Sequence, residues 1–283
     1  MEDERRQQDN SQREDDTTRD GPKKEEPTGS TPSESGRNPG LERIITDMQN
    51  GSVNFVERFD EVLASMPEDL RPPEEGSPRH RILEAARVLF AEEGFENTST
   101  RAIAERAEVN QAMIHYYFQS KDALYHRVLT TQILYFFNSV RQRVRDVEDP
   151  RDLLVRVPLT FYEVLTQNPI WKQIMRREMG SGAHGAIRAA KDLGQYGPLG
   201  MIRAMATLFE RLQQHPGFPD MRFPDAWAFL FGFAYSSAFI EPLMRAVYGE
   251  MGIHWSEDSL EERLATYNHL LRYGLFGQPR EDA

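Results

Sequence analysis

The stretch that decides the fold is "RILEAARVLFAEEGFENTSTRAIAERAEVNQAMIHYYFQSKDALYHRVL", residues 81–129. Its apolar residues recur at helical spacing in successive runs, which are separated by Gly94, by a turn at Glu108 and by Ser120. Residues that can cap these helices precede them: Ser77, Thr98 or Ser99, and Ser120. The pattern therefore predicts three short helices followed by one long helix.

The third short helix, "QAMIHYYF" at residues 111–118, has two different faces. On a helical wheel Ile114 and Phe118 fall on one side, with Tyr117 at its edge, and we expect them to pack on the helix of residues 82–90. Ala112 and Tyr116 fall on the opposite side. Met113 and His115 flank these two, and Gln111 joins them at the start of the helix. The outward face is thus predicted to be rich in groups that hydrogen-bond and stack.

Two short helices joined by a tight turn match the geometry that places a recognition helix in the major groove of DNA. Amide side chains can pair with adenine, methyl and thioether groups can meet a thymine methyl, and phenol and ammonium groups can reach phosphate. The N-terminus of the second helix offers another phosphate contact. We predict double-stranded DNA contacts from Ser99, Thr100, Arg101, Gln111, Ala112, Met113, His115, Tyr116, Tyr117 and Lys121.

The same stretch resembles the DNA-binding domain of TetR-family transcriptional regulators. The matching positions are Phe90, Gly94-Phe95, Thr98–Thr100, Ile103-Ala104, Ala107, Val109, Tyr117-Phe118, Ser120-Lys121 and Leu124. The resemblance implies a helix-turn-helix domain at residues 77–125, with its motif at 99–118, and an all-helical ligand-binding and dimerisation domain at 126–277. It also implies a homodimer that represses transcription from a near-palindromic operator and releases it when a small, largely apolar effector binds.

Two positions depart from the pattern of the family. Glu108 stands where the family commonly has glycine, so that a left-handed backbone there would be strained, or the turn differs. His115 stands where the family usually has tyrosine, which places an imidazole at an expected DNA-facing position. Residues 77–121 also carry six basic and six acidic side chains, so no strongly basic patch is expected.

Composition divides the chain unevenly. Met1 is the only apolar residue within 1–40, so this segment is predicted to be a disordered acidic tail. Residues 41–76 are predicted to form an amphipathic helical extension and a linker, with residues 41–66 docking on the body of the protein or on a partner. Residues 278–283 are expected to be a short tail. Of the net charge of −11, residues 77–283 account for only −1, so the acidic pI does not argue against DNA binding.

Several functions are disfavoured by what the sequence lacks. With no cysteine there can be no disulfide or thiolate metal site, and a cytoplasmic location is expected since no secretory signal is visible. The longest uncharged apolar run, at residues 226–240, is shorter than the roughly 20 residues that span a membrane. "GSGAHG" at 180–185 fits a dinucleotide-binding spacing but follows a predicted helix instead of a strand. We expect no cofactor, metal site or catalytic apparatus.

Helices are also predicted at about 151–167, 169–179, 184–193, 199–214, 224–248 and 257–275. Candidates for an effector pocket are Phe136, Phe137, Phe161, Tyr162, Trp171, Met175, Arg177, Met179 and His184, although the apolar ones are equally typical of a plain core. The last two helices would form the dimer interface through Trp227, Phe231, Tyr235, Phe239, Leu264, Tyr267 and Leu271.

Two alternatives remain open from the sequence. The first is a protein-interaction module that does not bind DNA, in which the outward face of residues 111–117 and the helices of 41–66 bind protein. The second is an all-helical enzyme that acts on the ligand in its pocket.

Overall fold

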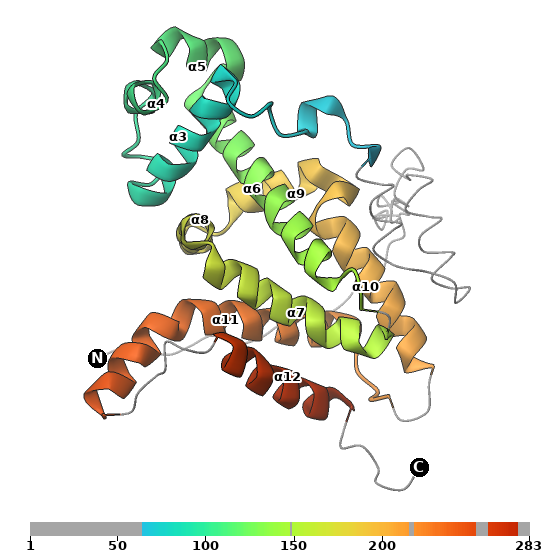
Figure 1. Cartoon of the computed structure of the whole chain (residues 1–283). Coiled ribbons are helices and arrows are strands. Elements are labelled where there is room, and N and C mark those ends of the chain that lie inside the picture. The colour runs from blue at the N-terminus through green and yellow to red at the C-terminus, as the bar shows by residue number, and fades with distance from the viewer. Residues whose placement is uncertain (1–63, 148, 215–217, 253–259, 277–283) are drawn as a thin grey trace, which may run out of the picture. The chain divides into compact units, whose positions relative to one another are not determined.

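The computed structural model describes residues 64–147, 149–214, 218–252 and 260–276, all within the unit formed by residues 37–283. These residues form α-helices and short 3-10 helices without any strand, which confirms the predicted all-α fold (Figure 1). The predicted tails at 1–40 and 278–283 and most of the amphipathic extension lie outside the described residues. No helix among the described residues is long and apolar enough to cross a membrane.

Three short helices form what we call the head: α3 (Pro78–Glu92), α4 (Thr100–Arg106) and α5 (Gln111–Phe118). Side-chain oxygens cap them, because the first amides of a helix have no partner within the helix. Ser77 accepts from the amide of His80 at 3.2 Å, and Ser99 accepts from the amide of Ala102 at 3.0 Å. The caps expected from the sequence therefore fix where α3 and α4 begin.

The turn after α3 follows the prediction. Gly94 has φ +88°, a conformation that favours glycine, and the ring of Phe95 folds back to 6.0 Å from that of Phe90. The buried hydroxyl of Thr98 donates to the carbonyl oxygens of Leu89 and Gly94, at 3.3 and 2.7 Å. These contacts set the angle at which the chain enters α4.

The turn between α4 and α5 is left-handed at Glu108, which has φ +53°. Of the two possibilities left open by the sequence, the structure adopts the strained one, at a typical cost of about 1–2 kcal/mol for a residue with a Cβ. The amide of Val109 closes the turn by donating to the carbonyl of Ala104 at 3.0 Å. Glu108 itself is exposed, so its side chain meets no obstacle.

The remaining helices form what we call the body. They are α6 (Lys121–Val144), α7 (Pro150–Gln167), α8 (Pro169–Gly180), α9 (His184–Leu193), the 3-10 helix η3 (Gly194–Tyr196), α10 (Pro198–Gln213), α11 (Phe223–Glu250) and α12 (Leu260–Phe276). The bounds of the six α-helices from α7 to α12 lie within three residues of the predicted ones, whereas η3 was not predicted. Helix α6 packs on α3, α7 and α9, while α7 packs on α6 and also on α11 and α12, so that α7 separates α6 from the last two helices (Figure 1).

The segment just before the head docks on the body. Met66 is 8% exposed within the core, and the 3-10 helix η2 (Glu68–Leu70) follows it. The guanidinium of Arg127 on α6 donates to the carbonyl oxygens of Asp69 and Arg71, at 2.6 and 2.5 Å. Residues 66–71 thus pack on the body; of the segment predicted to dock, 41–66, only residues 64–66 are described, and the rest of that prediction lies outside the described part of the chain.

Candidate nucleic-acid interface and effector site

Helix α5 divides its side chains as the periodicity predicts. Ile114 is fully buried and Phe118 is 5% exposed, and both belong to the core shared with α3. Tyr116, on the opposite side, is 80% exposed. Gln111, Ala112 and His115 are exposed as well. The outward face of the helix is therefore free to meet a partner over its whole length.

Two residues of this helix lie between the faces. Tyr117 straddles them as expected, since it is half-buried and its ring lies 4.9 Å from that of Tyr116. Met113 is also half-buried and packs against the core, which corrects the expectation that its side chain points outward. Because its side chain is flexible and lies at the edge of the outward face, Met113 can contact both the core and a partner.

The start of α4 lies next to α5. The side-chain amide of Gln111 donates to the hydroxyl of Thr100 at 2.9 Å, which joins the two helices of the motif. Arg101 pairs with Glu105 at 3.0 Å with its side chain largely exposed. Ser99 caps α4, so its hydroxyl already has a partner. The motif thus presents the exposed Arg101 and Gln111 beside the half-buried Thr100.

The structure places Lys121 differently from the expectation that it reaches phosphate. Its ammonium donates to the carbonyl oxygens of Phe95 and Thr98, at 2.9 and 3.2 Å, and lies 4.4 Å from the centre of the Phe95 ring. The two carbonyl oxygens and the ring stabilise the positive charge of Lys121 within the protein itself. Lys121 therefore joins the start of α6 to the turn between α3 and α4, which is a structural role.

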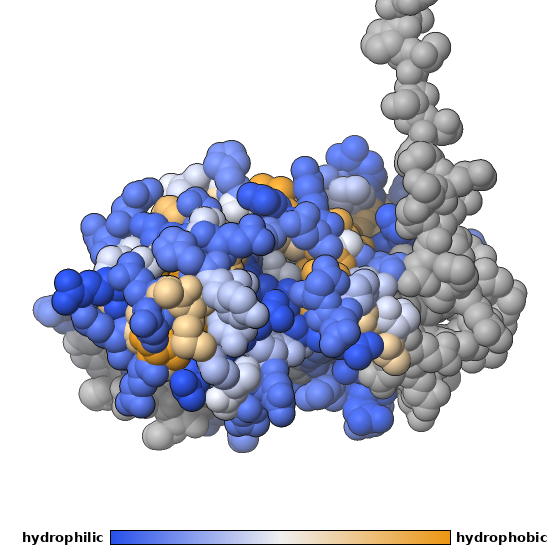
Figure 2. Space-filling view, turned by 90° about the horizontal axis from the view of Figure 1, so that it is seen from above, coloured by the Kyte–Doolittle hydropathy of each residue, from blue (hydrophilic) through white to orange (hydrophobic). Residues whose placement is uncertain are grey.

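Charge on the head is balanced, as the composition predicts. Arg87 pairs with Glu84, and Arg106 pairs with Glu92. The surface seen from the head end of the molecule is mostly hydrophilic, with small hydrophobic areas between polar side chains (Figure 2). Such a surface favours a polar partner, while its balanced charge limits the nonspecific attraction to DNA.

Most of the residues predicted for an effector pocket come together, but as packed core. Phe136, Phe161 and Trp171 are each at most 7% exposed, and the rings of Phe136 and Phe161 lie 4.5 Å apart. Tyr162 and Met175 are buried too. Residues from α11 extend this group into what we call the aromatic cluster: Phe136, Phe137, Phe161, Trp171, Phe231, Tyr235 and Phe239.

Three other pocket candidates do not line this cluster. Arg177 donates to the carbonyl oxygens of Ala91 and Glu92 at the end of α3, at 3.2 and 2.8 Å. Met179 is 50% exposed, and His184 is exposed at the start of α9. Helical spacing alone could not show that Arg177 on α8 turns toward the head, nor that Met179 on α8 and His184 on α9 turn toward the solvent.

The residues predicted for the dimer interface lie partly in the core of a single copy, so their role in pairing stays a prediction. Trp227, Phe231, Tyr235 and Phe239 are half-buried and pack against the core, with the rings of Phe231 and Tyr235 at 4.8 and 5.4 Å from that of Phe161. Leu264 and Tyr267 of α12 are half-buried, and Leu271 is 5% exposed. Because α11 is apolar nearly all round, the sequence could not indicate which side faces the core.

The structure contains a polar junction between head and body that no sequence pattern indicated. Buried Glu178 on α8 accepts from the hydroxyl of Tyr125 at 2.6 Å and from the amide of Ala186 at 2.8 Å. Burial, reinforced by the hydrogen bond to Glu178, raises the pKa of Tyr125. The ring of Tyr125 in turn packs on Phe90 at 4.9 Å. One carboxylate therefore connects α6, α8 and α9 directly beneath the head.

The described residues contain no group of three or more His, Asp or Glu side chains that could hold a metal ion. In the segment "GSGAHG", Gly180 is the last residue of helix α8, and the loop after it contains Ala183 at φ +59°. The arrangement of this segment is that of a connection between helices.

The sequence of the head is similar to that of known proteins. Residues 82–128 match the family model for bacterial regulatory proteins of the tetR family. The chain is 31% identical over 115 residues to the HTH-type transcriptional repressor NicS of Pseudomonas putida, a match that covers 40% of this chain and 52% of NicS. It is 48% identical over 48 residues to the probable HTH-type transcriptional regulator YttP of Bacillus subtilis, covering 17% and 23% of the two chains. The chain thus spans about half or less of the length of these relatives.

The likeness in fold extends over head and body. The fatty acid degradation regulator FadR of Bacillus halodurans superposes with a TM-score of 0.54 at 16% identity, covering 70% of this chain and 96% of that one. At this identity the similarity concerns the fold alone, that is, a helix-turn-helix domain followed by a helical domain.

Proposed function

We propose that the chain is a DNA-binding transcriptional repressor of the tetR type that a small, largely apolar effector releases from its operator, because residues 82–128 match the tetR family model and the related NicS is a transcriptional repressor. The observation that supports this most directly is the outward face of α5. Tyr116 at 80% exposure is an unusual feature for a helix that contributes only to folding. The word repressor rests on relatives that bear that name, among them NicS.

On DNA, α5 would lie in the major groove. Gln111 would exchange its bond to Thr100 for a two-point contact with adenine, and Ala112 would face a thymine methyl. His115 would add a base or phosphate contact, while Tyr116 would donate to a phosphate. With so little net positive charge on the head, strong binding requires two heads acting together.

A two-fold symmetric homodimer would supply the second head. Its two copies of α5 would enter successive major grooves about 34–36 Å apart, so the operator would be close to palindromic. Effector binding would then favour a spacing of the heads that no longer matches the grooves, as a shift between two populated states.

The aromatic cluster is the proposed effector site. The side chains that an effector would contact there are aromatic, and burial raises the pKa of Tyr235, whose phenol could orient one polar group of a ligand. Trp171 belongs to this cluster and lies on the same helix as Arg177, which holds the head. An effector that displaces Trp171 would therefore act on α8 and through it on α3.

The test begins with selection of DNA from a random-sequence duplex library by the full-length protein at low salt. We expect enrichment of one near-palindromic sequence, and a steep loss of affinity for it as salt rises. Tyr116→Ala should weaken binding of the selected duplex, whereas Tyr135→Ala, which alters a 59% exposed tyrosine on α6, should not. A library that remains random after repeated rounds would refute the proposal.

A further inference from the structure

The imidazole of His115 is held by the backbone just beyond the end of α5. Its Nδ1 lies 3.1 Å from the carbonyl oxygen of Gln119, and the amide of Gln119 donates to the carbonyl oxygen of His115 at 3.0 Å. The side chain of His115 is nevertheless exposed. One ring nitrogen is therefore bonded within the protein while the rest of the ring faces solvent.

The carbonyl oxygen of Gln119 can bind the imidazole because the chain turns sharply there. Gln119 has φ +66° and ψ −46°, and the amide of Ser120 donates to the carbonyl oxygen of Phe118 at 2.7 Å, which closes a three-residue γ-turn. In a continuous helix the amide of Ala123 would donate to Gln119. Here it donates to the hydroxyl of Ser120 at 3.0 Å, as the cap of α6. The imidazole of His115 takes the place of that amide.

This contact determines which nitrogen of the neutral ring carries the proton. A carbonyl oxygen can only accept a hydrogen bond, so Nδ1 of His115 must be the donor. Nε2 of the neutral ring is then an acceptor, and it has no hydrogen-bond partner within the described part of the chain. When the ring is protonated, Nδ1 keeps its bond and Nε2 becomes a donor. The exposed edge of His115 thus accepts in the neutral form and donates in the charged form.

His115 lies one helical turn after Gln111 on the same side of α5. Four residues correspond to about 6 Å along a helix axis, and base pairs follow each other at about 3.4 Å. In the proposed complex His115 therefore meets a base pair one or two steps from that contacted by Gln111. Neutral His115 cannot donate to a phosphate, because its one proton is in use. The donors that the major groove offers to Nε2 are the amino groups of cytosine and adenine.

We propose that His115 is a specificity-determining residue of the DNA interface, whose neutral ring accepts at Nε2 a hydrogen bond from the amino group of cytosine or adenine. This inference rests on the proposed function and specifies what one residue of α5 reads. Guanine presents only the acceptors N7 and O6 in the major groove, so neutral His115 disfavours it. Protonation reverses the preference, since Nε2 then donates to guanine and opposes an amino group.

Charged side chains surround α5 on the elements that pack against it, α3, α4 and α6, and on the turn before it. These side chains are Arg79, Arg81, Arg101, Glu105, Arg106, Glu108, Lys121 and Asp122. Arg101 pairs with Glu105, and Lys121 is bonded to carbonyl oxygens. Among the described residues none of them forms an ion pair or hydrogen bond with His115. Histidine changes its charge between about pH 5 and 8, so the change of base preference is expected in that range.

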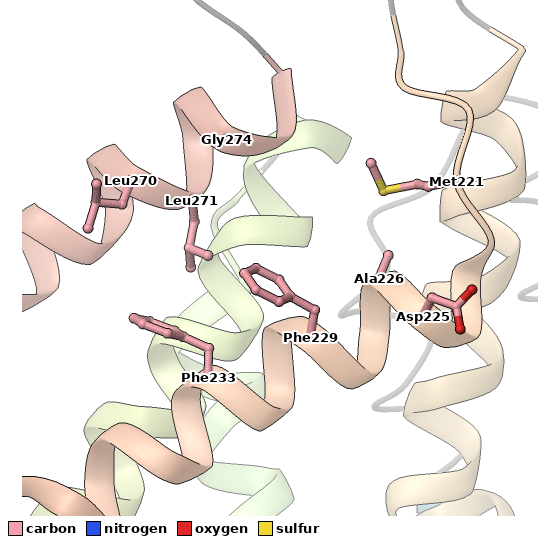
Figure 3. A pocket seen from close by; sticks show the side chains of 8 residues that line it. All are labelled: Met221, Asp225, Ala226, Phe229, Phe233, Leu270, Leu271 and Gly274. Carbon is pink, nitrogen blue, oxygen red and sulfur yellow. The ribbon is translucent and has the colours of Figure 1, made fainter.

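Two places in the body also carry titratable groups that could alter DNA affinity without reading a base. Nε2 of His126 on α6 lies 2.8 Å from the carboxylate of Asp192 on α9. Asp225 borders an otherwise apolar cavity of about 510 Å³ between α11 and α12 (Figure 3). A change at either place should alter the affinity for all DNA sequences alike. A change at His115 should alter the preference at one base position of each half-site.

The test measures base preference with duplexes derived from the selected sequence, in which each position is changed to every base in both half-sites. At about pH 8 we expect one position where cytosine or adenine is preferred to guanine by about 10-fold, because two half-sites each contribute one hydrogen bond. His115→Phe keeps a ring without Nε2 and should lose this preference alone. At about pH 6 the preference of the unaltered protein should shift toward guanine at least about threefold, and that of His115→Phe should not shift.

Two control variants separate this reading from other effects. His184→Phe, at an exposed histidine on α9, should keep every base preference. Gln119→Gly suits the positive φ and retains the carbonyl oxygen, so it should also keep the preference that His115 provides. Loss of that preference in Gln119→Gly would show that the side chain of Gln119 reads the base, which would overturn the inference.

The position of the proton can be measured without DNA. Nitrogen-15 spectra of the full-length protein at about pH 8 should show the neutral ring of His115 protonated at Nδ1, and His115→Phe identifies its signals among the seven histidines. A ring protonated at Nε2 would overturn the inference. If a duplex is selected and His115→Phe keeps every base preference, the inference is wrong while the proposed function stands. If no duplex is selected, the proposed function fails and the inference with it.

Discussion

Phe118 and Tyr116 lie two positions apart on α5, yet truncation to alanine should affect stability and DNA binding in opposite ways at the two positions. Phe118 is 5% exposed, and Phe→Ala changes at buried positions typically cost 3–5 kcal/mol. For a chain of this size that corresponds to a fall in Tm of about 6–20 °C. Tyr116 is 80% exposed, so Tyr116→Ala should change the free energy of unfolding by no more than about 0.5 kcal/mol.

For DNA affinity we expect the opposite: Tyr116→Ala should weaken binding more than Phe118→Ala. A hydrogen bond from the phenol of Tyr116 to a charged phosphate is worth about 1–1.5 kcal/mol net, and a homodimer would make it twice. Loss of about 2–3 kcal/mol lowers the affinity roughly 30- to 150-fold. Phe118→Ala, measured well below its Tm, should retain more affinity than Tyr116→Ala.

The two quantities come from separate measurements on the same samples. Thermal unfolding followed by circular dichroism gives Tm, and fluorescence polarisation with the selected duplex gives the dissociation constant. A Tyr116→Ala protein that unfolds as early as Phe118→Ala would show that the faces of α5 are wrongly assigned. Unchanged DNA affinity in a stable Tyr116→Ala protein would remove Tyr116 from the interface.

Three further variants test contacts that the sequence did not indicate. Lys121→Met breaks two bonds to carbonyl oxygens and should lower the free energy of unfolding by about 1–3 kcal/mol in urea titrations, with little effect on DNA affinity; weaker DNA binding at unchanged stability would restore Lys121 as a phosphate contact. The pKa of Tyr125 is raised in the folded state, so its contribution is complete below about pH 10, the unfolded value, and is lost as the pH rises further. Stability of the unaltered protein should therefore fall more steeply above pH 10 than that of Tyr125→Phe, and parallel curves would contradict this. Arg127→Ala removes both bonds from α6 to the carbonyl oxygens of residues 69 and 71 and should accelerate cleavage after Glu68 by the glutamate-specific protease Glu-C, as read by mass spectrometry; an unchanged rate would show that Arg127 does not hold the segment.

The head could be predicted from sequence because its determinants are local. Ser77 and Ser99 act on amides within three residues, and Gly94 sets a turn through its own backbone. The wheel assigned Ile114 and Phe118 correctly because α3, α4 and α6 cover one face of this eight-residue helix and leave the other exposed. Local rules of this kind need no knowledge of the rest of the chain.

The body resisted prediction because its helices have neighbours on several sides. In α11 the buried Leu230 and the exposed Phe229 are adjacent and equally apolar, so composition cannot distinguish core from interface. Lys121 offers another case, because the carbonyl oxygens that bind it come from a turn 23 to 26 residues earlier. Partners at such separation are fixed by tertiary structure alone.

The two polar residues at the end of α8 suggest why head and body are coupled. Arg177 holds the carbonyl oxygens that end α3, and Glu178, the next residue, holds Tyr125 of α6 and the start of α9. Adjacent residues on one helix cannot shift independently. A Cβ at Gly94 would lie 2.9 Å from the guanidinium of Arg177, so the space there fits the present position of α8 closely. Any displacement of α8 must therefore break contacts with the head or carry the head with it, which is the property that an effector-driven change in head spacing requires.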